Sequence, residues 1–234
     1  MFRSLTSGVV VVLLSAVALE AQPQRKGPAP ERSGSCKILV AGIVGGLDTP
    51  NNRFSGVVKI RKQLQALNNP EICAKTFSAY HWTSAYHWIA EYFPSRREER
   101  WSNEEIQSVP KIILYGHSLG GWACLSLARL LDTKGIPVEL TVQIDSVGFT
   151  DSVVPPNVKA AANFYHRATL PFLTRRNIRA ENENSTQVLG NSRIPHVGHI
   201  TITRRPEIAA VILDTVRTLS AAAPAAESRA AGSP

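Results

Sequence analysis

The sequence predicts an α/β protein built as a three-layer sandwich: a mostly parallel sheet with helices on both faces and little or no cap. Two observations predict this fold class. Short apolar segments rich in strand-forming residues alternate along the chain with amphipathic segments of helical period. A Gly-x-Ser-x-Gly sequence also stands between one predicted strand and the helix that follows it. Strands that alternate with helices pair in parallel, because each helix carries the chain back across the sheet.

The periodicity of apolar residues predicts each element in chain order. Strands are expected at residues 36–41, 71–79, 111–115 and 138–144, and helices at residues 55–67, 81–93, 121–131 and 206–219. A Gly-rich loop, 42–48, follows the first strand. The segment 138–144 alternates apolar and polar side chains, which predicts a position near the edge of the sheet. Pro206 suits the first turn of the last helix.

Both ends of the 234-residue chain are predicted to lie outside the folded domain. Residues 1–21 combine Arg3, a short apolar stretch and small residues, which is typical of a secretory signal peptide. Residues 22–35 resemble a flexible linker, and the Ala- and Pro-rich residues 220–234 are expected to be disordered. The α/β domain then spans residues 36–219. The protein is expected to be secreted or periplasmic, and the alternative is a membrane anchor formed by an uncleaved signal.

The formal net charge of +8 limits the partners. Arginines gather at Arg96-Arg97, at Arg175, Arg176 and Arg179, and at Arg204-Arg205. Aromatic side chains are not interleaved with these clusters as a base-stacking surface requires, so nucleic-acid binding is not expected. The charge predicts at most a weak association with an anionic envelope surface. The sequence makes no prediction of the oligomeric state.

Ser118 is the predicted nucleophile, because it is the central residue of Gly116-His117-Ser118-Leu119-Gly120. A turn between a strand and a helix is so tight that side chains two residues before and after the serine would collide with the backbone. The serine hydroxyl then projects from the sheet edge at a helix N-terminus, which favours a developing negative charge. The neighbouring His117 is expected to point away from the nucleophile and to pack the turn.

A nucleophilic serine needs a base and a carboxylate that orients the base, and in this architecture the chain order is serine, acid, histidine. Asp145 is the leading acid because it ends a predicted strand, and Asp151 is the reserve; Glu181 and Glu183 are more distant candidates. His199 is the leading base, since Gly198 lets the chain turn to present it, and His196 is its rival. His166 is predicted to be a packed or surface group inside an element.

Two backbone N–H groups should stabilise the negatively charged oxygen of a tetrahedral intermediate. One is predicted to be that of Leu119, the residue after the nucleophile. The second is predicted to come from Ile43 or Val44 in the Gly-rich loop after the first strand.

The cysteines and histidines do not predict a metal site. Cys124 lies in an apolar helix and is expected to be a buried thiol. Export would permit a disulfide between Cys36 and Cys73, although nothing in the sequence requires one. His196 and His199 have a metal-like spacing, but no carboxylate or cysteine stands close to them in sequence. No metal and no cofactor are expected.

Several motifs resemble the α/β-hydrolase superfamily, in particular its small lipase-like and esterase-like members. Residues 115–121 are similar to the lipase form of the serine turn, 154–158 followed by 163–165 to a segment after the acid, and 198–202 to the loop that carries the histidine. The resemblance covers most of residues 36–219. It implies Ser118 as nucleophile, Asp145 as acid and His199 as base. The chain departs from the family at Ala41-Gly42, where the oxyanion loop usually has His-Gly.

The residues and the resemblance together predict a serine hydrolase that cleaves carboxylic esters, including lipid esters, through an acyl-enzyme. Two alternatives remain at this stage. An acyltransferase or thioesterase would use the same three residues with another acceptor or leaving group. A catalytically inactive hydrolase fold could instead act as a binding protein of the cell envelope.

Overall fold

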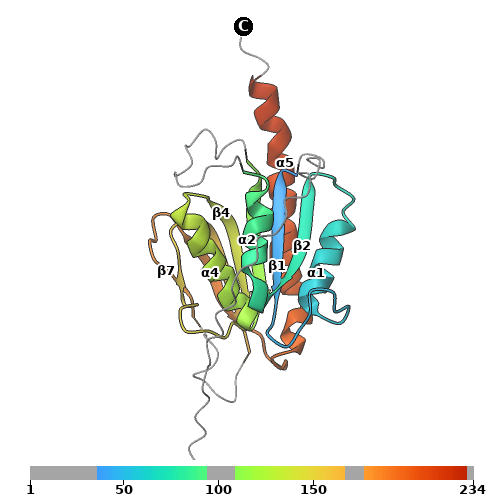
Figure 1. The fold of residues 1–234 in the computed structure, drawn as a ribbon, viewed down its shortest axis with the longest axis vertical. Helices are drawn as coiled ribbons and strands as arrows, with labels where there is room; N and C mark the ends of the chain where they lie inside the picture. The colour runs from blue at the N-terminus through green and yellow to red at the C-terminus, as the bar shows by residue number, and fades with distance from the viewer. Residues whose placement is uncertain (1–35, 94–108, 167–176, 231–234) are drawn as a thin grey trace, which may run out of the picture. The chain divides into compact units, whose positions relative to one another are not determined.

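Six strands form one parallel sheet in the computed structural model of the chain, which describes residues 36–93, 109–166 and 177–230 (Figure 1). The order across the sheet is β2 (Ile72–Ser78), β1 (Ile38–Val44), β3 (Lys111–His117), β4 (Val138–Ile144), β6 (Val158–Tyr165) and β8 (Gln187–Arg193). Every neighbouring pair in the sheet is parallel. Two-residue strands, β5 (Val153–Val154) and β7 (Arg179–Ala180), pair separately.

Helices cover both faces of the sheet and divide the core into two clusters. Helices α2 (Thr83–Ala90) and α4 (Leu119–Thr133) pack with one set of alternate β1 and β3 side chains. Helices α1 (Gly56–Gln65) and α5 (Pro206–Ala230) pack with the other set on the opposite face. Figure 1 shows α2 and α4 in front of the sheet and α5 behind it. The predicted three-layer α/β fold class is therefore confirmed.

Strand β1 runs three residues farther than the sequence predicts, to Val44 instead of Ala41. The reason is Gly42, which the sequence analysis assigned to a loop. A Cβ atom on Gly42 would lie 2.5 Å from the ring of Tyr115. Tyr115 is buried, and its hydroxyl donates a hydrogen bond to the carbonyl of Val57 at 2.9 Å. The glycine thus makes room for a packed ring inside the sheet and does not mark a turn.

The prediction of an edge position for residues 138–144 is wrong, because β4 lies between β3 and β6. Its polar side chains, which suggested exposure, are fully buried at Thr141 and Gln143. Gln143 donates its Nε2 hydrogen bond to the backbone carbonyl of Asp151 at 2.8 Å. The alternating polarity of this strand therefore does not mark contact with solvent at Thr141 and Gln143.

Two short 3₁₀ helices, η1 (Ala79–His81) and η2 (Thr201–Arg204), lie in loops after β2 and before α5. Helix α5 extends to Ala230, eleven residues beyond the helix end expected at Leu219. Alanine, the commonest residue of this extension, has the highest intrinsic helix propensity.

The described residues all belong to one compact unit, Gly34–Pro234. The predicted signal peptide and linker, residues 1–35, lie outside the described residues, as do 94–108, 167–176 and 231–234. The expectation of little or no cap therefore falls partly outside them as well. Within the described ranges no helix has both the length and the apolarity needed to cross a membrane.

Candidate active site

Ser118 lies in a tight turn between β3 and α4. Its backbone has φ 56° and ψ −125°, a left-handed conformation that costs a non-glycine residue free energy. A Cβ atom on Gly116 would lie 2.2 Å from the carbonyl oxygen of Gly120, and one on Gly120 would lie 2.2 Å from that of Ile43. Main-chain atoms cannot move aside as flexible side chains can, so both positions require glycine. The structure thus has the nucleophile-elbow geometry that the motif predicts.

Asp145 follows β4, the strand next to β3, and is fully buried. Its Oδ2 lies 2.5 Å from Nδ1 of His199, a residue 54 positions later in the loop before η2. Its backbone also has a positive φ, 47°, and its N–H donates to the carbonyl of Phe164 at 2.6 Å. The chain therefore presents a serine elbow, then a carboxylate, then a histidine at the carboxyl ends of parallel strands.

The fold is the α/β-hydrolase fold. Its parallel sheet, covered on both faces, supports the elbow after β3, and the acid emerges from the next strand in the sheet. Ligand sites of open parallel sheets gather at this edge, because loops at the carboxyl ends of the strands meet there. The residues predicted to be nucleophile, acid and base thus come from loops at one edge of the sheet.

Asp145 is held as a carboxylate. Burial by itself would raise the pKa of this carboxyl, but the hydrogen bonds from His199 and from the backbone N–H of His166 outweigh burial. The pKa of Asp145 therefore lies below its ordinary value. An ionised Asp145 can accept the Nδ1 proton of His199, which leaves Nε2 of that ring free to accept a proton.

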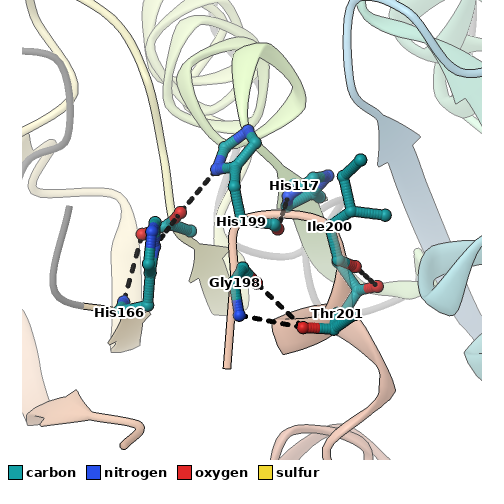
Figure 2. Close-up of polar contacts among 8 residues, drawn as sticks. His117, His166, Gly198, His199, Ile200 and Thr201 are labelled. Atoms are coloured by element: carbon teal, nitrogen blue, oxygen red, sulfur yellow. Dashed lines mark hydrogen bonds and ion pairs between the residues drawn. The ribbon is translucent and has the colours of Figure 1, made fainter. Parts of the chain in front are cut away.

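His117 connects the elbow to the histidine loop. Its Nε2 lies 2.7 Å from the carbonyl oxygen of His199, and Figure 2 shows this contact beside the ring of His199. Since a carbonyl oxygen only accepts, Nε2 of His117 carries the proton. Burial, helped by the charge of His199 nearby, lowers the pKa of His117 to about 4. His117 is therefore a neutral donor that fixes the backbone of His199 next to the elbow, and it packs the elbow as expected.

His166 is a residue of the site that the sequence did not predict. It follows directly after β6, and its Nδ1 lies 2.6 Å from the same Oδ2 of Asp145 that His199 contacts. Its backbone N–H donates to Oδ1 of Asp145 at 3.2 Å. The sequence placed His166 inside an element, whereas β6 ends at Tyr165. A boundary one residue earlier would have put this histidine at the same sheet edge as Asp145.

The two rival residues lie in different surroundings. Asp151 is fully buried, but its Oδ2 accepts a hydrogen bond from the hydroxyl of Ser146 at 2.6 Å. His196 is an exposed turn residue with φ 57°. The ring nitrogens of His166 and His199 lie within 4.8 Å of the Asp145 carboxylate, and His196 is not part of this group. The geometry therefore pairs Asp145 with His199, and Asp151 has a structural hydrogen bond.

The candidate oxyanion donors lie at the start of α4 and at the end of β1. Leu119 is the first residue of α4, so its N–H has no partner within the helix and is available to a ligand. Ile43 pairs with both Phe77 and Gly116 inside the sheet, whereas Val44, the last residue of β1, pairs with Ser78 on one side and is not paired with β3. Val44 is thus better placed than Ile43 to supply the second predicted donor.

Cys36 and Cys73 form a disulfide with their Cα atoms 5.8 Å apart, a pairing that the sequence permitted but did not require. Cys124 is free and buried, as the sequence predicted. Burial raises the pKa of its thiol well above the ordinary value, so it is a packing residue and not a second nucleophile.

No protein-family model matches the chain. No curated protein matches it either. Solved structures similar to it include a thioesterase domain of NocB from the nocardicin cluster, with 11% identity and a TM-score of 0.47 over 78% of this chain and 95% of that one. Another is the RedJ thioesterase of the prodiginine pathway in Streptomyces coelicolor, with 9% identity and a TM-score of 0.46 over 83% and 90% of the two chains. A third is the surfactin thioesterase domain SrfTE, with 13% identity and a TM-score of 0.40 over 76% and 91%.

Proposed function

We propose that this protein is a serine hydrolase that cleaves carboxylic esters through Ser118, His199 and Asp145. The observation that carries the proposal is the 2.5 Å contact between Asp145 and His199 in a chain whose elbow holds Ser118 in a left-handed conformation. His117, the residue before the nucleophile, forms a hydrogen bond to the backbone carbonyl of His199. A buried carboxylate, an oriented imidazole and a serine on a helix N-terminus are the parts that acyl transfer requires.

The reaction proceeds in two halves. The Ser118 hydroxyl attacks the acyl carbonyl carbon while Nε2 of His199 takes its proton, and Asp145 stabilises the imidazolium through Nδ1–H. The N–H groups of Leu119 and Val44 bind the oxyanion. The tetrahedral intermediate expels the alcohol, which receives the proton from His199, and leaves an acyl-enzyme. His199 then takes a proton from water, which attacks the acyl carbonyl carbon, and the second tetrahedral intermediate expels the Ser118 oxygen, which takes the proton back from His199 as the carboxylic acid is released.

Exposed apolar side chains on the loops near the elbow support a substrate with an apolar acyl group. Leu47 lies in the Gly-rich segment 42–48, and Ile200 adjoins His199; both are exposed. A Cβ atom on Gly46 would lie 3.0 Å from the hydroxyl of exposed Tyr80 and 3.4 Å from Leu119, so Tyr80 lies beside the start of α4. Large apolar groups exposed near a reaction site favour an acyl chain or lipid ester over a charged substrate.

Thioesters and acyl transfer to an alcohol use the same residues, and a direct comparison decides among them. The purified protein is assayed with a nitrophenyl ester series of increasing acyl length, the matching acyl thioesters, and an added alcohol acceptor. We expect ester hydrolysis that rises with acyl length and is lost in Ser118→Ala. Faster thioester cleavage would assign thioesterase activity, and acylated alcohol as the main product would assign acyl transfer. No turnover by folded protein would favour the envelope-binding alternative.

We further propose that the protein is exported. The signal-like residues 1–21 support export, and so does the disulfide between Cys36 and Cys73, because disulfides persist in oxidising compartments. The net charge of +8 would favour weak association with an anionic envelope surface. The mass of the protein recovered from the producing cells tests the first part. A mass lacking about the first twenty residues is expected for cleavage of a signal, and the full-length mass in a membrane fraction would support the anchor.

A further inference from the structure

Three metal-ligating side chains converge at the acid of the proposed triad. Asp145, His166 and His199 each offer a ligand atom, and these atoms all lie within 4.8 Å of one another. This is the only group of three or more such residues in the described part of the chain. The rings of His166 and His199 both contact Oδ2 of Asp145, and Figure 2 labels the two histidines at this site. A serine mechanism needs one imidazole on that carboxylate, so the second requires an explanation.

We propose that Asp145, His166 and His199 form a Zn²⁺ site whose occupation switches the hydrolase off. Two imidazole nitrogens and one carboxylate oxygen are the ligand set of open zinc sites, in which a water takes the fourth position. The binding part of the proposal stands on this geometry alone. The inhibitory part rests on the proposed function.

Binding of a tetrahedral zinc ion requires moderate changes in the distances between the three ligand atoms. The Oδ2 of Asp145 lies 2.5 Å from Nδ1 of His199 and 2.6 Å from Nδ1 of His166. Zinc bonds of about 2.0–2.1 Å place ligand atoms about 3.3 Å apart. The two pairs that include Asp145 must therefore open by less than about 1 Å, and the two histidine ligand atoms, which lie within 4.8 Å of each other, must approach by up to about 1.5 Å. His166 directly follows β6 and His199 precedes η2, so the two rings come from separate segments of the chain.

A metal ion can reach these residues, and hydrogen bonds hold two of them in place. Asp145 is buried and the His166 side chain is only 14% exposed, but the His199 side chain is 37% exposed, so an ion can enter from that side. The backbone N–H of His166 donates to Oδ1 of Asp145, and His117 donates to the carbonyl of His199. Hydrogen bonds of this kind orient metal ligands.

Inhibition follows from the proton positions on His199. A metal bound at Nδ1 displaces the proton from that nitrogen, and the neutral ring then carries its one proton on Nε2. Nε2–H cannot accept the proton of Ser118. The metal also occupies the Asp145 oxygen that orients the ring. Bound zinc therefore removes the base without changing any covalent bond.

Zinc binding is measured first by calorimetric titration of metal-free Ser118→Ala protein, which makes the result independent of activity. We expect one Zn²⁺ per chain, no comparable binding of Mg²⁺, which prefers oxygen ligands, and at least about 100-fold weaker Zn²⁺ binding in Ser118→Ala/His166→Asn. The matched control is Ser118→Ala/His196→Asn, which alters the exposed histidine of the same loop and should bind as tightly as Ser118→Ala. Thermal unfolding establishes that each variant is folded, and His166→Gln provides a second removal of the ligand.

Inhibition is then measured as the rate of labelling by a fluorophosphonate probe with Zn²⁺ and after chelation. Zinc should slow labelling at least about tenfold in the wild type and in His196→Asn, since it removes the base. In His166→Asn the labelling rates with Zn²⁺ and after chelation should agree within twofold. Absence of stoichiometric binding, or equal binding after loss of His166, would overturn the proposal. Binding without any labelling of metal-free wild type would refute the proposed hydrolase function and leave the zinc site standing.

Discussion

The nucleophile elbow and the cluster of Asp145 with its two histidines lie at the same sheet edge but are held by different means. The elbow is set by close main-chain contacts, of Gly116 with the carbonyl of Gly120 and of Gly120 with the carbonyl of Ile43. In the cluster, His166 and His199 lie 21 and 54 residues after Asp145 in the chain, and charge and hydrogen bonds hold the three residues together. Damage to the elbow should therefore reduce stability, whereas damage to the cluster should reduce activity first.

Replacement of Asp145 by Asn should produce the largest effect. The amide cannot hold the His199 tautomer or stabilise the imidazolium, so kcat/KM should fall by about 10⁴. The matched control is Asp151→Asn, which changes a buried carboxylate that binds Ser146 and should keep more than a tenth of the activity when folded. Rates of ester hydrolysis at saturating and at limiting substrate give kcat and kcat/KM for each variant. Equal losses in the two variants would refute the assignment of Asp145.

Gly120→Ala should cause the largest loss of stability. The new Cβ would lie 2.2 Å from the main-chain oxygen of Ile43, so the free energy of unfolding should fall by about 3 kcal/mol. In Gly198→Ala the nearest atom, Oγ1 of Thr201, is 3.9 Å away, and the change should stay within about 0.5 kcal/mol. Urea denaturation of both variants measures the difference. A Gly120→Ala protein as stable as Gly198→Ala would contradict the constraint on the elbow.

His117 should make folding stability depend on pH. Its pKa is about 4 in the folded protein and near 6.5 when unfolded, so the unfolded chain binds the proton first as pH falls. Stability should therefore decrease from about pH 6.5 down to pH 4, by at most about 3 kcal/mol from this residue. His117→Gln keeps a donor for the His199 carbonyl and does not titrate. The stability difference between wild type and variant across this range tests the prediction, and a difference that does not change with pH would contradict it.

The smallest effect is expected on acyl-chain preference. Ile200 adjoins His199 and is exposed, so Ile200→Ser should lower kcat/KM about fivefold for a long-chain ester and leave an acetyl ester unchanged, since one buried aliphatic contact contributes about 1 kcal/mol. The control, Leu189→Ser, alters an exposed apolar residue on strand β8. An equal change for short and long chains would show that Ile200 does not contact the acyl group.

The same contrast explains what could be predicted from the sequence. The elbow could be predicted because the glycine spacing and the junction between a strand and a helix are features of a few consecutive residues. The pairing of Asp145 with His199 followed from chain order and strand ends. The role of His166 could not be seen, because it depends on where β6 ends and on which strand lies beside β4. The prediction that Gly42 lies in a loop was wrong for a related reason. The Tyr115 ring that occupies the space beside Gly42 is 73 positions away in the chain.

Labelling of the folded protein by a fluorophosphonate probe, with mass-spectrometric mapping of the modified residue, tests the central claim most directly. An activated serine at the elbow predicts stoichiometric labelling at Ser118 in the wild type and none in Ser118→Ala. Labelling that persists in Ser118→Ala, or no labelling of folded, metal-free wild type, would contradict a hydrolase site built on Ser118, Asp145 and His199.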